Sequence, residues 1–164
     1  MEDENRISRA LRLFEKAYER QSSGDLDTAV DLYKASIAEA PTAEAHTYLG
    51  WTYSFQGRYD EAIVECKRAI TVDPQFGNPY NDIGSYLIQM GQHDQAIPWL
   101  QMAKKAERYE PRHFPYLNLF RIYMKKGELD AAQREIEQAK FIQQRQEMAD
   151  GTLEDEDGEI PIVH

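Results

Sequence analysis

The chain has few of the residue types that most often carry catalysis or metal binding. Its one cysteine, Cys66, excludes an internal disulfide and fits a reducing compartment. The histidines show no pairing at helical spacing, and no His-Glu-x-x-His, Walker or Gly-x-Gly-x-x-Gly motif occurs. The sequence therefore predicts a protein that is not an enzyme, with no catalytic residues, no metal site and no cofactor.

Basic residues and long apolar runs are also scarce. Nineteen Lys and Arg face 29 Asp and Glu, which gives a formal net charge of −10. Nucleic-acid binders present a basic face, so we expect no nucleic-acid partner. No apolar run approaches the ~18 residues of a membrane span, and the first residues lack the apolar core of a signal peptide. We expect a cytoplasmic protein without a membrane partner.

What the sequence does contain is a motif, Gly-x-(Leu/Tyr/His)-Asp-x-Ala, that occurs four times. The four glycines, Gly24, Gly57, Gly91 and Gly127, are separated by 33, 34 and 36 residues. A period near 34 is typical of stacked helix-turn-helix units. Apolar and small residues recur at steps of three and four on both sides of each glycine, which predicts two amphipathic helices per unit.

Each position of the motif has a physical role. The glycine is expected to end the first helix in a left-handed conformation, where a Cβ would cost about 1 kcal/mol. The aspartate three residues later, such as Asp27, is expected in the first turn of the second helix, where it can cap. Close packing of the two helices is expected at two positions. One is the small residue seven positions before the motif glycine, such as Gly50, and the other is the alanine five positions after that motif glycine. Cys66 occupies a repeat-core position and is expected to be buried.

One unit, residues 43–76, reads Leu49-Gly50, Tyr53, Gly57-Arg58-Tyr59, Ala62, Ala69 and Pro74. This pattern resembles the tetratricopeptide repeat family, and the resemblance extends over about residues 10–146. It implies an all-α fold, a right-handed α-solenoid of four helix-turn-helix repeats at about residues 10–42, 43–76, 77–112 and 113–146.

The two ends of the domain are expected to differ from the internal repeats. From Leu129 to about Met148 there is no Gly or Pro, which predicts an extended last helix. The stretch from Glu147 to His164 holds seven acidic residues and no Lys or Arg. We therefore expect a tetratricopeptide repeat domain over residues 1–148, followed by a disordered acidic tail over residues 149–164.

The resemblance also implies a binding site, because the first helices of such repeats line a concave face. The residues predicted to form a peptide-binding groove there are Tyr18, Tyr48, Trp51, Phe55, Asn81, Asp82, Asn118, Arg121 and Lys125. Aromatic residues and Arg are the commonest binding hot spots, and Asn amides can pair with a peptide backbone. An alternative interpretation is that Tyr48, Trp51 and Phe55 only pack between adjacent repeats.

Some relatives bind the acidic C-termini of chaperones through a clamp of Lys, Asn and Arg side chains. Neither register of the repeats supplies those cations, and Asp82 would repel a terminal carboxylate. The favoured function is an adaptor that binds a protein or peptide partner in the groove. The alternative is a self-assembling scaffold that forms a homo-oligomer through Phe141 and Ile142 of the last helix, or through the apolar residues 160–163 of the tail.

Overall fold

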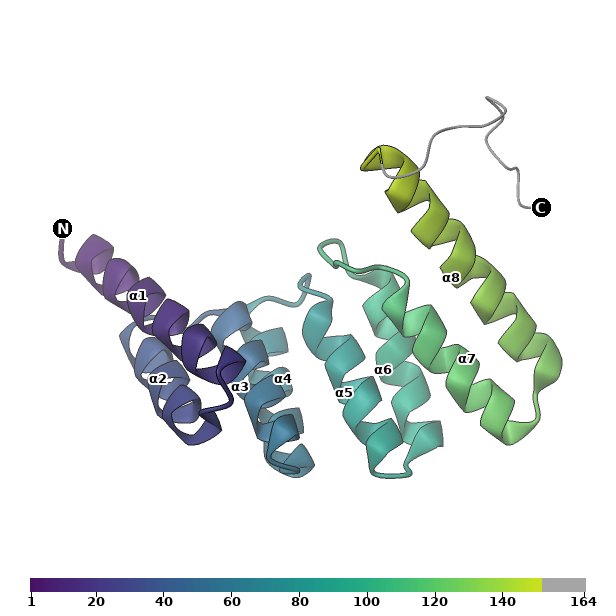
Figure 1. The fold of residues 1–164 in the computed structure, drawn as a ribbon, viewed down its shortest axis with the longest axis horizontal. Helices are drawn as coiled ribbons and strands as arrows, with labels where there is room; N and C mark the ends of the chain where they lie inside the picture. Colours follow the sequence, from purple (N-terminus) through teal and green to yellow (C-terminus); the bar gives the residue numbers. More distant parts are fainter. Residues whose placement is uncertain (152–164) are drawn as a thin grey trace. The chain divides into compact units, whose positions relative to one another are not determined.

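The computed structural model describes residues 1–151, and within this range the chain forms eight α-helices (Figure 1). Their bounds are α1 Glu2–Ser22, α2 Leu26–Glu39, α3 Ala43–Phe55, α4 Tyr59–Val72, α5 Asn78–Gln89, α6 His93–Lys105, α7 Phe114–Lys126 and α8 Leu129–Ala149. The chain divides into two compact units, Met1–Tyr109 with α1 to α6 and Glu110–His164 with α7 and α8. None of the helices in the described range is both long enough and apolar enough to cross a bilayer.

The helices are arranged in consecutive pairs. In the first unit α1 packs on α2, α3 on α4 and α5 on α6, and the pairs are joined by packing of α2 on α3, α4 on α5 and α3 on α5. In the second unit α7 packs on α8. The predicted all-α fold of helix-turn-helix repeats is confirmed. The predicted acidic tail from residue 152 onward lies outside the described residues.

The motif glycines end the first helix of each pair, as predicted. Gly24, Gly57, Gly91 and Gly127 have φ values of 85°, 73°, 77° and 75°. This left-handed region strains residues with a Cβ but not glycine, so the four glycines allow the chain to reverse within two or three residues. The residue that caps the N-terminus of α2, by contrast, is not the predicted one.

In α2 the cap is Asp25, whose carboxylate accepts a hydrogen bond from the Thr28 backbone N–H at 3.3 Å. Asp25 precedes the first helical turn and has the non-helical backbone of a cap, whereas Asp27 already lies within the turn. The prediction that Asp27 caps this helix is therefore wrong. Its carboxylate instead accepts a hydrogen bond from the Gln56 side chain at 2.8 Å, which links the first helix pair to the turn of the second.

Small residues bring the paired helices into close contact. A Cβ added at Gly50 would lie 2.9 Å from the Ala62 carbonyl oxygen and 3.3 Å from the Cys66 sulfur. A Cβ added at Gly84 would overlap the side chain of Leu100, which is fully buried. Cys66 is buried as predicted, and this burial raises the pKa of its thiol well above the ordinary value. The thiol is therefore a core side chain with little thiolate character at neutral pH.

The two terminal helices are the longest. Helix α8 has 21 residues, whereas α2, α4 and α6 have 14, 14 and 13, which confirms the predicted extension of the last helix. Helix α1 also has 21 residues and begins at Glu2, well before the expected start of the first repeat near residue 10. Three acidic residues, Glu2, Asp3 and Glu4, fill its first turn, where they interact favourably with the helix dipole.

Candidate binding surface

Five aromatic side chains of the first unit form a continuous row, here called the aromatic band: Phe14 and Tyr18 of α1 and Tyr48, Trp51 and Phe55 of α3. Their spacing of three and four residues places the rings of each helix on one face. Across the two helices, the Tyr48 ring centroid lies 5.2 Å from that of Phe14 and 5.9 Å from that of Tyr18. Along α3 the Tyr48–Trp51 and Trp51–Phe55 centroid distances are 5.7 and 5.2 Å.

The outer rings of this band are exposed. Tyr18, Trp51 and Phe55 retain 47%, 41% and 57% of their accessible surface, whereas Phe14 and Tyr48 are half-buried. Tyr48 thus packs between the first and second helix pairs, which agrees with the alternative interpretation that these aromatic residues pack between adjacent repeats. Trp51 and Phe55 are not covered in this way. A contiguous row of exposed rings on a folded domain is characteristic of a surface that contacts another molecule.

A buried polar group with an unused donor lies beneath the band. The hydroxyl of Tyr33 donates a hydrogen bond to the Gln21 side-chain oxygen at 2.6 Å, and the Tyr33 ring contacts Phe14 and Tyr48. Burial is the main cause that raises the pKa of Tyr33, and the neighbouring Tyr48 and Tyr18 raise it further. Among the described residues the Gln21 side-chain nitrogen has no hydrogen-bond partner, although Gln21 is only 8% exposed. An unpaired buried donor costs about 1–3 kcal/mol, so this amide lowers the stability of the first helix pair.

Asp82 on α5 is the acidic residue of the predicted site, and its charge is unpaired among the described residues. No hydrogen bond or ion pair joins it to any residue of the range 1–151, and it is partly exposed. Burial raises the pKa of its carboxyl to about 7. The Asp82 charge in turn contributes to raising the pKa of Tyr48, after burial and Tyr18. Asp82 also stands nine residues before Gly91, as Tyr48 does before Gly57, and α5 packs on α3.

The remaining predicted site residues lie in other surroundings. Asn81 is buried and hydrogen-bonded with Tyr109, so an internal contact occupies its side chain. In the second unit, the buried Asn118 accepts a hydrogen bond from the Arg121 guanidinium at 3.0 Å, while Arg121 and Lys125 are exposed on α7. The structure thus groups Tyr18, Tyr48, Trp51 and Phe55 in the first unit, and Asn118 with Arg121 in the second.

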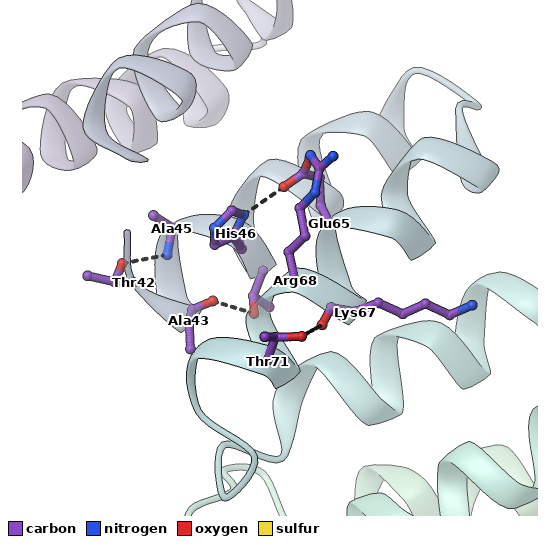
Figure 2. A network of polar contacts seen from close by, with 9 residues as sticks. Thr42, Ala43, Ala45, His46, Glu65, Lys67, Arg68 and Thr71 are labelled. Atoms are coloured by element: carbon purple, nitrogen blue, oxygen red, sulfur yellow. Dashed lines mark hydrogen bonds and ion pairs between the residues drawn. The ribbon is translucent and has the colours of Figure 1, made fainter. Parts of the chain in front are cut away.

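A buried polar network that the sequence did not reveal joins α3 to α4 (Figure 2). The Glu65 carboxylate lies 2.7 Å from His46 Nδ1 and accepts a hydrogen bond from Arg68 at 2.5 Å. Burial opposes ionisation of Glu65, but the His46 hydrogen bond and the Arg68 charge outweigh it and hold its pKa below the ordinary value. The other helix pairs carry Leu32, Trp99 and Glu135 at the position of Glu65, so the repeat pattern gave no signal for this network.

Comparison with known proteins finds similarity to one repeat family. Profiles described as tetratricopeptide repeat match residues 43–76 and 78–109. The small glutamine-rich tetratricopeptide repeat-containing protein 2 of Mycosarcoma maydis is 26% identical over 102 residues, which are 62% of this chain and 29% of that protein. The chain therefore spans less than a third of the length of that relative.

Solved structures with a similar fold include the following two. The crystal structure of MamA is 21% identical with a TM-score of 0.74, and the match covers 84% of this chain and 80% of that one. The first TPR domain of Spaghetti (RPAP3), bound to the HSP90 peptide SRMEEVD, is 18% identical with a TM-score of 0.66, and the match covers 73% and 94% of the two chains. At these identities the likeness shows the arrangement of helices alone.

Proposed function

Because this chain belongs to the tetratricopeptide repeat family, we propose that it is a protein-interaction adaptor whose aromatic band binds an extended peptide segment of a partner protein. Proteins of this family mediate protein–protein interactions and are typically not enzymes. The observation that carries the proposal is the exposure of Tyr18, Trp51 and Phe55 in one row of touching rings.

Such a row is well suited to bind apolar side chains. Aromatic rings bury a large area and lose little side-chain entropy on binding, and they dominate binding hot spots. Here each ring is held by its neighbours, so little ordering is required when a ligand arrives.

A second surface is proposed on α7. The Arg121 and Lys125 side chains are exposed, and the hydrogen bond from Arg121 to Asn118 holds the guanidinium in place. These groups are suited to acidic side chains of a partner, with an affinity that falls as salt rises. This surface belongs to the second unit and is proposed independently of the aromatic band.

Self-assembly through the last helix is the weaker alternative. Phe141 and Ile142, which would form that contact, are half-buried within their own unit. The Arg145 guanidinium also lies over the Phe141 ring at 5.7 Å from its centroid. Neither side chain offers a free apolar surface comparable to Trp51 and Phe55.

The adaptor proposal is tested with the intrinsic fluorescence of Trp51. The chain has two tryptophans, and a Trp99→Phe variant leaves Trp51 as the sole reporter. Peptides of about 12 residues selected from a displayed random library should shift Trp51 emission to shorter wavelength in a saturable manner, because binding removes the ring from water. Selected peptides that bind without altering Trp51 emission would place the binding site elsewhere.

A further inference from the structure

We propose that Asp82 binds a basic side chain, Lys or Arg, of the peptide that occupies the aromatic band. This inference rests on the proposed function and adds to it the charge of the ligand. The ligand is thus a peptide segment in which a basic residue lies close to apolar residues.

The position of Asp82 supports this assignment. It lies on α5, which packs against α3 of the aromatic band and against α4. It stands nine residues before Gly91, just as Tyr48 stands nine residues before Gly57, so the two residues occupy matching positions on the packed helices α5 and α3. Asp82 therefore lies where the second helix pair meets the third, close to the central ring of the band.

The carboxylate lacks the partner that such a position normally requires. A charge withdrawn from water is costly unless it is paired and hydrogen-bonded. Within residues 1–151, no Lys, Arg or His forms an ion pair with Asp82, and no backbone or side-chain donor bonds to it. Burial raises the pKa of Asp82 to about 7, which reflects this lack of compensation. A cation supplied by a ligand would provide it.

The surrounding groups favour a cation over other ligands. The faces of Tyr48 and Trp51 carry partial negative charge and attract Lys and Arg, while the methylene groups of those side chains pack on the rings. A carboxylate would be repelled by Asp82. A divalent metal ion requires several oxygen ligands, and no cluster of three candidate ligand residues is found among the described residues.

The experiment uses a library-selected peptide and its analogue in which the basic residue is replaced by norleucine, a side chain of similar length without charge. Both are titrated against the wild-type chain and Asp82→Asn. The basic peptide should bind the wild type at least about tenfold more tightly than its analogue, the effect of one hydrogen bond to a charged group. Asp82→Asn should remove this difference and leave the affinity for the analogue nearly unchanged. The substitution removes a partly exposed charge that has no partner within residues 1–151, so the variant is expected to fold.

The pH dependence gives a second readout. Between pH 6 and 8 the Asp82 carboxyl ionises, because its pKa is raised to about 7. The basic peptide should therefore bind the wild type up to about tenfold more tightly at pH 8 than at pH 6, and Asp82→Asn should show no such change. The neighbouring titratable groups, Tyr48, Cys66, Tyr86 and Tyr109, all have their pKa raised from values of 9.0 or above, so none of them titrates in this range.

The outcomes separate this inference from the function on which it rests. Selected peptides without Lys or Arg, or a norleucine effect that persists in Asp82→Asn, would overturn the assignment of Asp82. If Asp82→Asn lowers the affinity for both peptides equally, the assignment is also overturned, because Asp82 would then support the structure of the site and not bind the basic side chain. If Trp51→Ala retains both peptides at full affinity, the aromatic band itself is not the site. If Trp51→Ala abolishes binding of both peptides, but the wild type binds the basic peptide and its norleucine analogue equally well, then the aromatic band is the site and only the role of Asp82 is refuted.

Discussion

The imidazole Nδ1 of His46 lies 2.7 Å from the Glu65 carboxylate, and this contact joins α3 to α4 inside the second helix pair (Figure 2). Both residues are almost completely buried, so neither can exchange its partner for water without opening the pair. Glu65 also accepts the hydrogen bond from Arg68 on its own helix. Loss of this carboxylate would leave the buried His46 without its partner, whereas the Arg68 side chain is exposed to water.

We therefore expect Glu65→Ala to lower the free energy of unfolding by roughly 1–3 kcal/mol, the usual cost of leaving a buried polar group unsatisfied. Urea denaturation followed by circular dichroism measures the change. The matched control is Glu61→Ala on the same helix, whose ion pair with Arg58 is exposed and should contribute less than about 1 kcal/mol. Equal effects of the two substitutions would contradict the structural role of Glu65.

The same carboxylate predicts a dependence of stability on pH. The folded-state pKa of Glu65 is lowered from its ordinary value of 4.5, so its ionised form stabilises the fold above that pH. This contribution should be lost as the pH falls below 4.5 and through the lower folded-state pKa. The difference in unfolding free energy between the wild type and Glu65→Gln should shrink over that range. A difference that is constant from pH 7 to pH 3 would show that Glu65 does not titrate as described.

Gly50→Ala tests how closely α3 and α4 approach each other. In a helix interior with free space, this substitution stabilises by up to about 1 kcal/mol. Here the new Cβ would meet the Ala62 carbonyl oxygen at 2.9 Å, a backbone atom that cannot move aside without shifting α4. We expect a net destabilisation of about 1–3 kcal/mol in urea denaturation. Because the two expectations differ in sign, a stabilised variant would mean that the helices are less tightly packed.

Trp51→Ala should lower the affinity for a library-selected peptide at least about thirtyfold, because truncation of an aromatic hot spot commonly costs 2 kcal/mol or more. Isothermal titration calorimetry measures the affinity, and circular dichroism checks that helicity is retained. Val64→Ala is the matched control, since Val64 is also an exposed apolar residue but lies on α4 outside the aromatic band. A larger loss in Val64→Ala than in Trp51→Ala would contradict the proposed surface.

The HSP90 peptide SRMEEVD, which is bound in the similar structure of Spaghetti, should bind this chain no better than a scrambled peptide. The sequence has Asp82 where a chaperone-tail clamp would have a cation, and this carboxylate would repel the peptide terminus. Fluorescence anisotropy with a labelled peptide provides the measurement. Saturable, salt-sensitive binding at micromolar concentration, absent from the scrambled control, would refute the expectation.

Repeat register alone predicted much of the fold. The left-handed glycines and the burial of Cys66 follow from positions that recur in every helix pair. The close approach at Gly50 follows from a position that is small in the first three pairs and is Phe120 in the fourth. The grouping of Tyr48 with Tyr18 also follows, because adjacent first helices carry their lining residues at matching positions. Whether this grouping binds a ligand stays a prediction.

Features specific to one helix pair could not be predicted in this way. The His46–Glu65 contact joins side chains 19 residues apart and depends on the distance between two packed helices. The start of α1 at Glu2 was missed because the acidic first turn is exposed and carries no apolar periodicity. The capping role of Asp25 was assigned to Asp27 because only the latter recurs in all four motifs.

The burial of Cys66 has a practical consequence for experiments on this chain. As the sole thiol, and one that lies between α3 and α4 with no exposed surface, it reacts with a thiol reagent only when these helices separate. The rate of alkylation therefore reports the opening of one helix pair under native conditions. A cysteine introduced on the surface could be labelled with a fluorophore while Cys66 remains in place, so distances could be measured without altering the core.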